Sequence, residues 1–329
     1  MSSPDGSREE LVMGKVAFVF PGQASQYPGM GRELAEKYSA ARAVFNEADN
    51  ALGFSISKMC FEGAEEDLKL TANTQPAILT CSVAVHRVLA EKGVTPNFVA
   101  GHSLGEYSAL VAAGALKFSD AVQLVRKRGQ YMQEAVPAGQ GAMAAIMGLS
   151  PAVVMDACRR AADGEVCSPA NLNSPEQTVI SGHAGAVKRT VEIASQSGAK
   201  RAVILAVSAP FHCALMMPAQ ELLEKDLKST PFSGLQMPLV TNVDADTITT
   251  GDEAREALIR QVTMAVRWEE SMRLLVEEGV DTFVEVGPGR VLVGLLRQIE
   301  RSVGALNVED EKSLSTTMDK IAQSRADAA

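Results

Sequence analysis

Short apolar runs alternate with longer amphipathic stretches along most of the chain. The apolar runs Lys15–Phe20, Phe98–Gly101 and Thr282–Val286 are each followed by a glycine-containing turn and then by a helical pattern. A strand that is apolar along its whole length is buried on both faces, and strands that alternate with helices form a parallel sheet. The pattern therefore predicts an α/β fold with a mostly parallel sheet.

The pattern changes between residues 138 and 208. The order strand, helix, strand, strand, helix, strand is predicted there, over 141–147, 151–161, 166–172, 177–181, 184–197 and 201–207. This βαββαβ order is typical of a ferredoxin-like arrangement. We therefore expect a small ferredoxin-like domain, 138–208, inserted into a large α/β-hydrolase-like domain that comprises 13–137 and 209–309.

The remaining elements follow from periodicity and capping signals. Pro76 is expected to open a helix that runs to about Lys92, and Ser119 to cap the helix after it. A strand is expected over 239–243, and further helices are expected over 32–51, 120–136, 252–265, 268–278 and 290–299. The first twelve residues, 1–12, are polar and are expected to form a disordered leader. The polar segment 310–329 is expected to be a C-terminal tail with one amphipathic helix and a frayed end.

Composition narrows the class of protein. The chain has 329 residues, 46% of them hydrophobic, and a net charge of -9, so it has a large core and nucleic acid is not its expected partner. The five cysteines are scattered and lack metal-binding spacing, which indicates reduced thiols, a cytoplasmic protein and no metal site. No apolar run approaches the roughly 18 residues of a membrane span.

A serine between two glycines lies where a predicted strand meets a predicted helix. Gly101 and Gly105 flank Ser103 two residues away on each side, after the apolar run Phe98–Gly101 and before a helix-like stretch over Tyr107–Leu116. A nucleophile on such a turn has a strained backbone, and glycine leaves room for strand and helix to approach. Ser103 is therefore the candidate nucleophile. The alternative is a glycine-rich turn with an incidental serine.

Two backbone N–H groups lie at turns of this kind. Leu104 begins the new helix, whose positive end directs its N–H toward a reacting carbonyl. The turn Pro21-Gly22 directly follows the strand Lys15–Phe20 and brings the backbone close to another group, where Gln23 would supply an N–H. An ordinary connection between strand and helix explains this second turn equally well.

One arginine lies on an apolar helix face. Leu124 and Met132 are each four residues from Arg128, on the stripe that faces the core. A buried guanidinium needs an anion, because an unpaired buried charge is costly. Arg128 is therefore a candidate for binding an anionic substrate. A structural ion pair with an Asp or Glu of the same chain is the alternative.

The candidate base is a histidine at the return to the large domain. His212 follows Pro210 and Phe211 in a loop that can present it to Ser103. His102, beside the nucleophile, should point away from the attacking face. Gln261 lies on the apolar stripe of its helix and must be hydrogen-bonded. Gln261 is a candidate to supply the carbonyl oxygen that accepts a hydrogen bond from the imidazole and so orients it. The alternative is a purely structural role, as a cap or bridge.

These motifs together resemble the malonyl-CoA:acyl carrier protein transacylases, the acyltransferase family of fatty acid and polyketide synthesis. The resemblance extends from Val16 to about Ile299. The matching motifs are Phe20-Pro21-Gly22-Gln23 with Ser25-Gln26, Gly101-His102-Ser103-Leu104-Gly105-Glu106-Tyr107, Arg128-Gly129, Ala142-Met143-Ala144-Ala145-Ile146, Asn173-Ser174-Pro175, His212-Cys213-Ala214-Leu215-Met216 and Glu285-Val286-Gly287-Pro288-Gly289.

The resemblance implies a role for each matched residue. Ser103 would be the nucleophile and His212 the base, with no acidic third member, since the carbonyl of Gln261 would orient the histidine. Arg128 would hold the free carboxylate of malonyl. The oxyanion hole would be formed by the N–H groups of Gln23 and Leu104, and the pocket by His102, Asn173 and Phe211. Phe211 is typical of malonyl-selecting members, whereas Ala265 stands where the family often has a proline.

The implied activity is transfer of malonyl from malonyl-CoA to the phosphopantetheine thiol of acyl carrier protein. The transfer would be a ping-pong reaction through a malonyl-serine, supplying type II fatty acid synthesis. A cytoplasmic monomer with no bound cofactor is expected. The alternatives are a stand-alone acyltransferase of a polyketide pathway, an α/β-hydrolase-type thioesterase and a non-catalytic docking component of a synthase.

Overall fold

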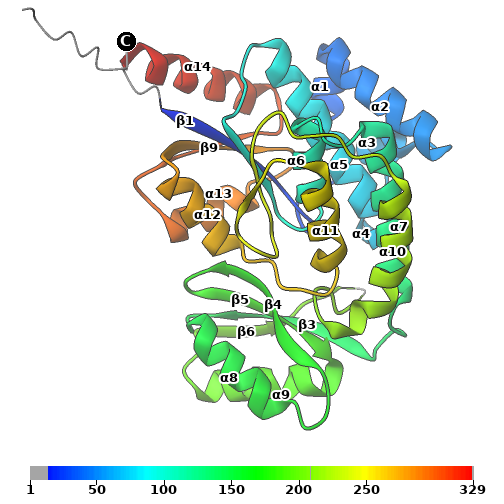
Figure 1. Ribbon diagram of the computed structural model, residues 1–329, viewed down its shortest axis with the longest axis vertical. Helices are drawn as coiled ribbons and strands as arrows, with labels where there is room; N and C mark the ends of the chain where they lie inside the picture. Colours follow the sequence, from blue (N-terminus) through cyan, green and yellow to red (C-terminus); the bar gives the residue numbers. More distant parts are fainter. Residues whose placement is uncertain (1–13, 208, 328–329) are drawn as a thin grey trace, which may run out of the picture.

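The chain folds into two units, each built on its own sheet (Figure 1). The computed structural model describes residues 14–207 and 209–327, so the leader predicted over 1–12 lies outside the described residues. Element order along the chain is mixed α/β. Among the active-site candidates, Ser103 follows β2 of the large sheet and Asn173 lies on β4 of the small sheet.

The large sheet has six strands in the order β10-β9-β1-β2-β7-β8. All neighbours pair in parallel except β7 and β8, so the prediction of a mostly parallel sheet is confirmed. The strands are β1 (Lys15–Phe20), β2 (Phe98–Gly101), β7 (Leu239–Val240), β8 (Thr247–Ile248), β9 (Val280–Val286) and β10 (Gly304–Val308). The sequence analysis missed β8 and β10, because neither is a fully apolar run.

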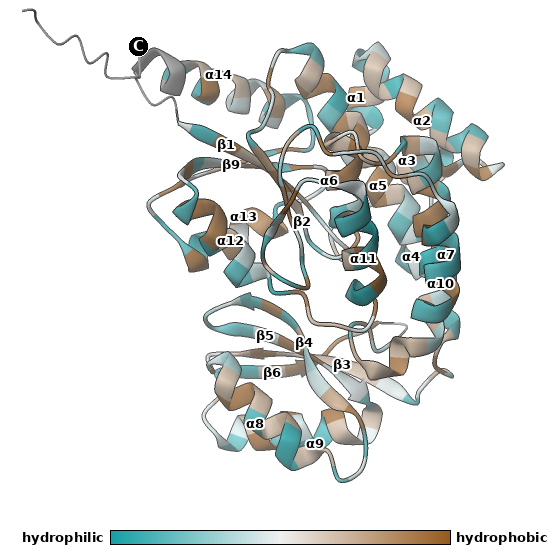
Figure 2. Cartoon of the chain, viewed as in Figure 1, coloured by the Kyte–Doolittle hydropathy of each residue, from teal (hydrophilic) through white to brown (hydrophobic). Residues whose placement is uncertain are grey.

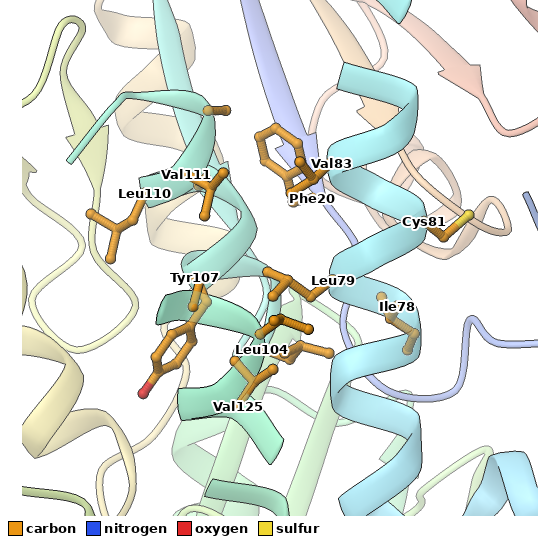
Figure 3. Close-up of a cluster of buried hydrophobic side chains, with 14 of the residues drawn as sticks. Phe20, Ile78, Leu79, Cys81, Val83, Leu104, Tyr107, Leu110, Val111 and Val125 are labelled. Carbon is orange, nitrogen blue, oxygen red and sulfur yellow. The ribbon is translucent and has the colours of Figure 1, made fainter. Parts of the chain in front are cut away.

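Helices cover both faces of the large sheet. Along β1, Phe18 and Phe20 belong to one buried apolar cluster while Ala17 and Val19 belong to a second on the opposite face. The first cluster is formed with α5 (Thr71–Glu91), α6 (Gly105–Ala112) and α7 (Phe118–Glu134), and the second with α12 (Trp268–Glu277) and α13 (Val291–Ile299). Figure 2 shows apolar residues along the central strands, and Figure 3 shows part of the first cluster.

Two predicted helices differ from the observed ones, the first by a break and the second by an earlier start. The expected helix over 32–51 is two helices, α1 (Arg32–Lys37) and α2 (Ser39–Leu52), because Tyr38 adopts extended backbone angles. Helix α5 begins at Thr71, so Pro76 lies inside it. Proline cannot donate to the carbonyl four residues earlier. Arg126 donates to that carbonyl instead, with Nη1 2.7 Å from the oxygen of Ala72.

Other predicted boundaries shift by a few residues. Helix α7 begins at Phe118 after Lys117, so Ser119 is not its cap. Helix α11 (Gly251–Gln261) begins at a capping box formed by Thr250 and Glu253 and ends four residues before the predicted end. The strand expected over 239–243 ends at Val240, since the chain turns there into the β7–β8 hairpin.

The small unit has the predicted βαββαβ order. Its antiparallel sheet runs β4-β5-β3-β6, and its two helices lie on the face farther from the large sheet (Figure 1). Its elements are β3 (Gly141–Met147), α8 (Pro151–Ala161), β4 (Cys167–Ser174), β5 (Gln177–His183), α9 (Ala184–Gln196) and β6 (Arg201–Ile204). Strand β4 joins the units: Leu172 donates to the carbonyl of Val266, and Val266 donates to that of Ala170.

The remaining helices complete the large unit. They are α3 (Ile56–Glu62), α4 (Glu65–Lys69), η1 (Ala214–Met216), α10 (Met217–Ser229) and α14 (Glu311–Asp327). The amphipathic helix expected within 310–329 is α14, and its Leu314 and Ile321 are buried near β10. All five cysteines are free thiols, as expected.

Candidate active site

Ser103 lies on a sharp turn between β2 and α6. Its φ is 52°, a left-handed conformation that is rare outside glycine. A Cβ added at Gly101 would lie 2.0 Å from the backbone of Gly105, and one added at Gly105 would lie 2.0 Å from the carbonyl oxygen of Phe20. Only glycine permits this approach, which is the geometry that the sequence predicted.

An asparagine that the sequence analysis did not single out holds this turn. Asn242 follows β7, and its Oδ1 accepts from the N–H of Ser103 at 2.7 Å. Its Nδ2 donates to the carbonyl of Gly101 at 2.7 Å. One buried side chain thus bonds the backbone on both sides of His102 and stabilises the strained conformation.

His212 lies within hydrogen-bonding distance of the candidate nucleophile. Its Nε2 is 2.8 Å from Ser103 Oγ, and its Nδ1 is 2.8 Å from the carbonyl oxygen of Gln261 and 3.2 Å from that of Met264. Carbonyl oxygens only accept hydrogen bonds, so Nδ1 carries the proton. Nε2 is then the acceptor, and Ser103 donates its hydroxyl proton to it. The pair is oriented for removal of that proton.

The site favours the neutral form of His212. Burial, followed by the charge of Arg128, lowers the pKa of His212 to about 3, although the carbonyl of Gln261 opposes this shift. A general base is active when neutral. Lowering the pKa therefore extends the active range of His212 toward acid.

We expect the rate of serine acylation to fall with acid only at pH values well below the ordinary pKa range of histidine. The second-order rate constant for acyl loading of the free enzyme should stay nearly constant from about pH 8 to about pH 5, because the profile reports the free-enzyme pKa of the base. Rapid-quench loading across this range provides the measurement. A tenfold loss by about pH 5.5 would indicate a base with an unperturbed pKa.

Arg128 is buried beside the same hydroxyl. Only 1% of the residue is exposed, and its Nη2 lies 3.0 Å from Ser103 Oγ and 2.9 Å from Gln261 Oε1. Nη1 lies 2.9 Å from Gln75 Oε1. The sequence analysis left a structural ion pair open, but none of the described Asp or Glu residues forms an ion pair with Arg128.

Arg128 is therefore a buried cation whose contacts are neutral oxygens. Its guanidinium also lies over the ring of Tyr107, 5.6 Å from the centroid. The group stays charged in proteins and pairs well with carboxylates. A small anion held next to Ser103 Oγ would complete its environment.

The two candidate oxyanion N–H groups belong to this turn, at Leu104, and to the loop that follows β1, at Gln23. Neither the N–H of Gln23 nor that of Leu104 donates to any residue in the described part of the chain. The two backbones approach closely, since a Cβ added at Gly22 would lie 2.5 Å from the carbonyl oxygen of His102. The Gln23 side chain connects to the arginine through Gln75, whose Nε2 lies 3.3 Å from Gln23 Oε1.

The three predicted pocket residues occupy different places. His102 Nε2 is 2.9 Å from Asn173 Oδ1, and its ring packs against Trp268 with centroids 5.4 Å apart. These contacts turn His102 toward the small unit and away from Ser103. Asn173 is buried on β4 of the small unit, where it contacts His102 of the large unit, and its pocket role stays a prediction. Phe211 is buried in the first apolar cluster, and its pocket role stays a prediction.

Two kinds of feature, a cluster of metal ligands and a membrane-spanning helix, are absent from the described residues. In that part of the chain, no three His, Cys, Asp or Glu side chains gather as metal ligands. None of its helices is long and apolar enough to cross a bilayer.

Comparison with known proteins shows the family of the chain. Residues 17–323 match the family model of the acyl transferase domain. The chain belongs to the acyl transferase family. It is 50% identical to the malonyl CoA-acyl carrier protein transacylase of Bacillus subtilis over 303 residues, which are 92% of this chain and 96% of that protein. The resemblance inferred from the motifs is thus confirmed.

Solved members of the acyl transferase family share this fold. The crystal structure of an acyl carrier protein S-malonyltransferase from Vibrio cholerae has a TM-score of 0.90 at 47% identity, covering 92% of this chain and 99% of that one. A malonyl-transacylase solved in complex with a type II polyketide synthase acyl-carrier protein has a TM-score of 0.91 at 46% identity, covering 93% and 99%.

Three polar residues of this acyl transferase site were given no role in the sequence analysis. They are Gln75, Glu106 and Asn242. Gln75 lies among other polar residues in the first turns of its helix and carries no signal of its own, whereas Glu106 directly follows the turn between Gly101 and Gly105. Asn242 comes shortly after a strand that pairs in parallel with β2. Because the carboxyl ends of parallel strands meet at one edge, such residues belong to the site.

Proposed function

We propose that the chain transfers a malonyl group from malonyl-CoA to the phosphopantetheine thiol of acyl carrier protein, supplying extender units for type II fatty acid synthesis. The observation that carries the proposal is the buried guanidinium of Arg128, 3.0 Å from Ser103 Oγ and without a carboxylate partner among the described residues. In a malonyl-serine, the free carboxylate lies three atoms from Oγ. It can therefore fold back onto this guanidinium.

The first half-reaction forms the malonyl-serine. His212 Nε2 takes the proton of Ser103 Oγ, which attacks the thioester carbonyl of malonyl-CoA. The N–H groups of Gln23 and Leu104 donate to the resulting oxyanion. The carbon–sulfur bond then breaks, the thiolate of CoA leaves, and His212 returns the proton to that sulfur.

The second half-reaction runs the same steps in reverse on a new thiol. His212 takes the proton of the phosphopantetheine thiol, whose sulfur attacks the malonyl-serine carbonyl. The bond to Ser103 Oγ breaks, and the serine recovers its proton from His212. The names of the relatives, which include one solved with an acyl-carrier protein, support this acceptor. The proposed chemistry uses a serine, an imidazole and backbone N–H groups, and it requires no cofactor.

The architecture suits this role. We propose that the six-stranded unit is an α/β-hydrolase-like catalytic domain, 13–137 and 209–309, and that the inserted unit, 138–208, is a ferredoxin-like domain. The βαββαβ order and the placement of Ser103 at the carboxyl end of β2 support these assignments. A cytoplasmic monomer is the proposed working form.

Transfer and hydrolysis can be separated directly. The protein is mixed with malonyl-CoA alone, with malonyl-CoA and phosphopantetheinylated acyl carrier protein, or with malonyl-CoA and the unmodified carrier. We expect a CoA burst equal to the enzyme in the first mixture and catalytic malonylation of the carrier only in the second. Steady CoA release without carrier would instead favour a thioesterase, and no release at all would favour a docking component.

A further inference from the structure

Glu106 is a buried acid next to the active site that the proposed mechanism does not use. It lies in the first turn of α6, three residues after Ser103, and only 1% of it is exposed. Within the described chain it forms no ion pair. A carboxylate is rarely buried without a partner of opposite charge, so its position requires an explanation.

One oxygen of this carboxylate makes both of its hydrogen bonds. Oε2 accepts from Gln261 Nε2 at 2.9 Å and from the backbone N–H of Asn242 at 3.0 Å. Oε1 is buried and has no hydrogen-bond partner among the described residues. The carboxylate thus adds a buried contact between α11 and the segment after β7, beside the direct contact of Gln261 Nε2 with Asn242 Oδ1 at 3.4 Å.

Gln261 is the residue through which this contact reaches the chemistry. Its Nε2 also donates to the carbonyl of Ser103 at 3.0 Å, and its Oε1 accepts from Arg128 Nη2 at 2.9 Å. Its backbone carbonyl accepts from His212 Nδ1 at 2.8 Å. Gln261 therefore touches the nucleophile, the anion-binding cation and the base at once.

The orientation of the Gln261 amide is set by what surrounds it. An ionised carboxylate and a carbonyl only accept hydrogen bonds, and a guanidinium only donates them. With Glu106 and Ser103 on one side and Arg128 on the other, the nitrogen must face the first two and the oxygen the third. A flipped amide would place donor against donor.

We propose that Glu106 is a positioning residue that, through Gln261, fixes Arg128 for acyl groups carrying a free carboxylate. This inference rests on the proposed function. Glu106 acts by offering an acceptor at Oε2, so the position of that oxygen matters and the charge does not. Glu106 itself touches none of the reacting atoms, and its effect falls on selectivity between acyl groups.

The electrostatics agree with an acceptor role. Burial raises the pKa of Glu106 to about 7, against the opposing hydrogen bonds from Gln261 and Asn242. Near neutral pH a proton can therefore occupy the carboxyl group. Since Oε1 is the oxygen without a partner, protonation there leaves Oε2 free to accept. A glutamine at this position reproduces that neutral form.

The test compares two substitutions with a matched control. Glu106→Met keeps the side-chain length and removes the acceptor, whereas Glu106→Gln keeps an oxygen for Gln261 and removes the charge. Glu285→Met is the control: Glu285 is also buried, also has a pKa raised to about 7, and accepts from Leu292 and Val293 at the start of α13. Loading rates with malonyl-CoA and acetyl-CoA are measured per loadable site, which removes the effect of misfolded protein.

The malonyl-to-acetyl rate ratio decides the outcome. We expect Glu106→Met to lower this ratio about tenfold, the equivalent of one lost hydrogen bond. Glu106→Gln should stay within about threefold of the wild type, and Glu285→Met should leave the ratio unchanged even if it unfolds at lower temperature. A wild type that does not prefer malonyl would refute the proposed function itself, whatever the variants do.

Three results would overturn the positioning role. An unchanged ratio in Glu106→Met would make Glu106 merely structural. A fall in Glu106→Gln as large as that in Glu106→Met would assign the effect to charge instead of the acceptor. Failure of Glu106→Gln to fold would also show that the charge is required, because this variant retains the acceptor.

Discussion

Ser103→Ala is expected to abolish acyl loading from malonyl-CoA, with a loss on the order of 10⁴-fold or more. The hydroxyl oxygen is the atom that forms the new bond, and no other hydroxyl of the described residues lies within hydrogen-bonding distance of His212. Backbone N–H groups and Arg128 remain, so malonyl-CoA should still bind. Rapid-quench loading measures the rate, and equilibrium titration measures the binding.

A serine on the same helix provides the control for this substitution. Ser108 is also buried, and its hydroxyl has no hydrogen-bond partner among the described residues. Ser108→Ala should load malonyl at close to the wild-type rate. Loading of Ser103→Ala at a comparable rate would place the nucleophile elsewhere.

Arg128→Ala is expected to discriminate sharply between acyl groups. Loss of a buried, hydrogen-bonded charge pair costs about 2–5 kcal/mol, so loading from malonyl-CoA should fall by roughly 30- to several-thousand-fold. The acetyl group of acetyl-CoA has no free carboxylate, so the substitution removes no charge pair from this substrate. Its rate should fall far less, by about tenfold, for the hydrogen bond between Nη2 and Ser103 Oγ.

Two further variants at this position separate charge from packing. Arg128→Met fills much of the same buried volume without a charge and should show the same selectivity loss as Arg128→Ala. Arg128→Lys keeps a charge but lacks the planar fork, so it should recover malonyl loading only in part. Equal losses for malonyl and acetyl in all three variants would contradict the assignment of Arg128 as the carboxylate-binding group.

Local features of the site could be predicted from the sequence because their causes are local. The turn at Ser103 needs Gly101 and Gly105, and both lie within two residues of it. Arg128 was found because its helix face is otherwise apolar, and its burial confirms that reading. The order of elements followed from periodicity in the same way.

Features that depend on distant segments could not be predicted. Asn242 accepts a hydrogen bond from the N–H of Ser103, 139 residues away in the sequence, and Glu106 accepts one from Gln261, 155 residues away. Pro76 lies inside helix α5, where Arg126 of another helix bonds the carbonyl of Ala72 that proline cannot bond. The low pKa of His212 arises from burial and from Arg128 together. Each of these effects exists only once the chain has folded.

The central claim is that Ser103 accepts a malonyl group whose carboxylate is held by Arg128. The most direct test is mass spectrometry of the intact and digested protein after brief mixing with equal amounts of malonyl-CoA and acetyl-CoA, without carrier protein. We predict one malonyl group per chain, mapped to the peptide containing Ser103, with little acetyl. An unmodified protein, an adduct on another residue, or equal malonyl and acetyl labelling would contradict the claim.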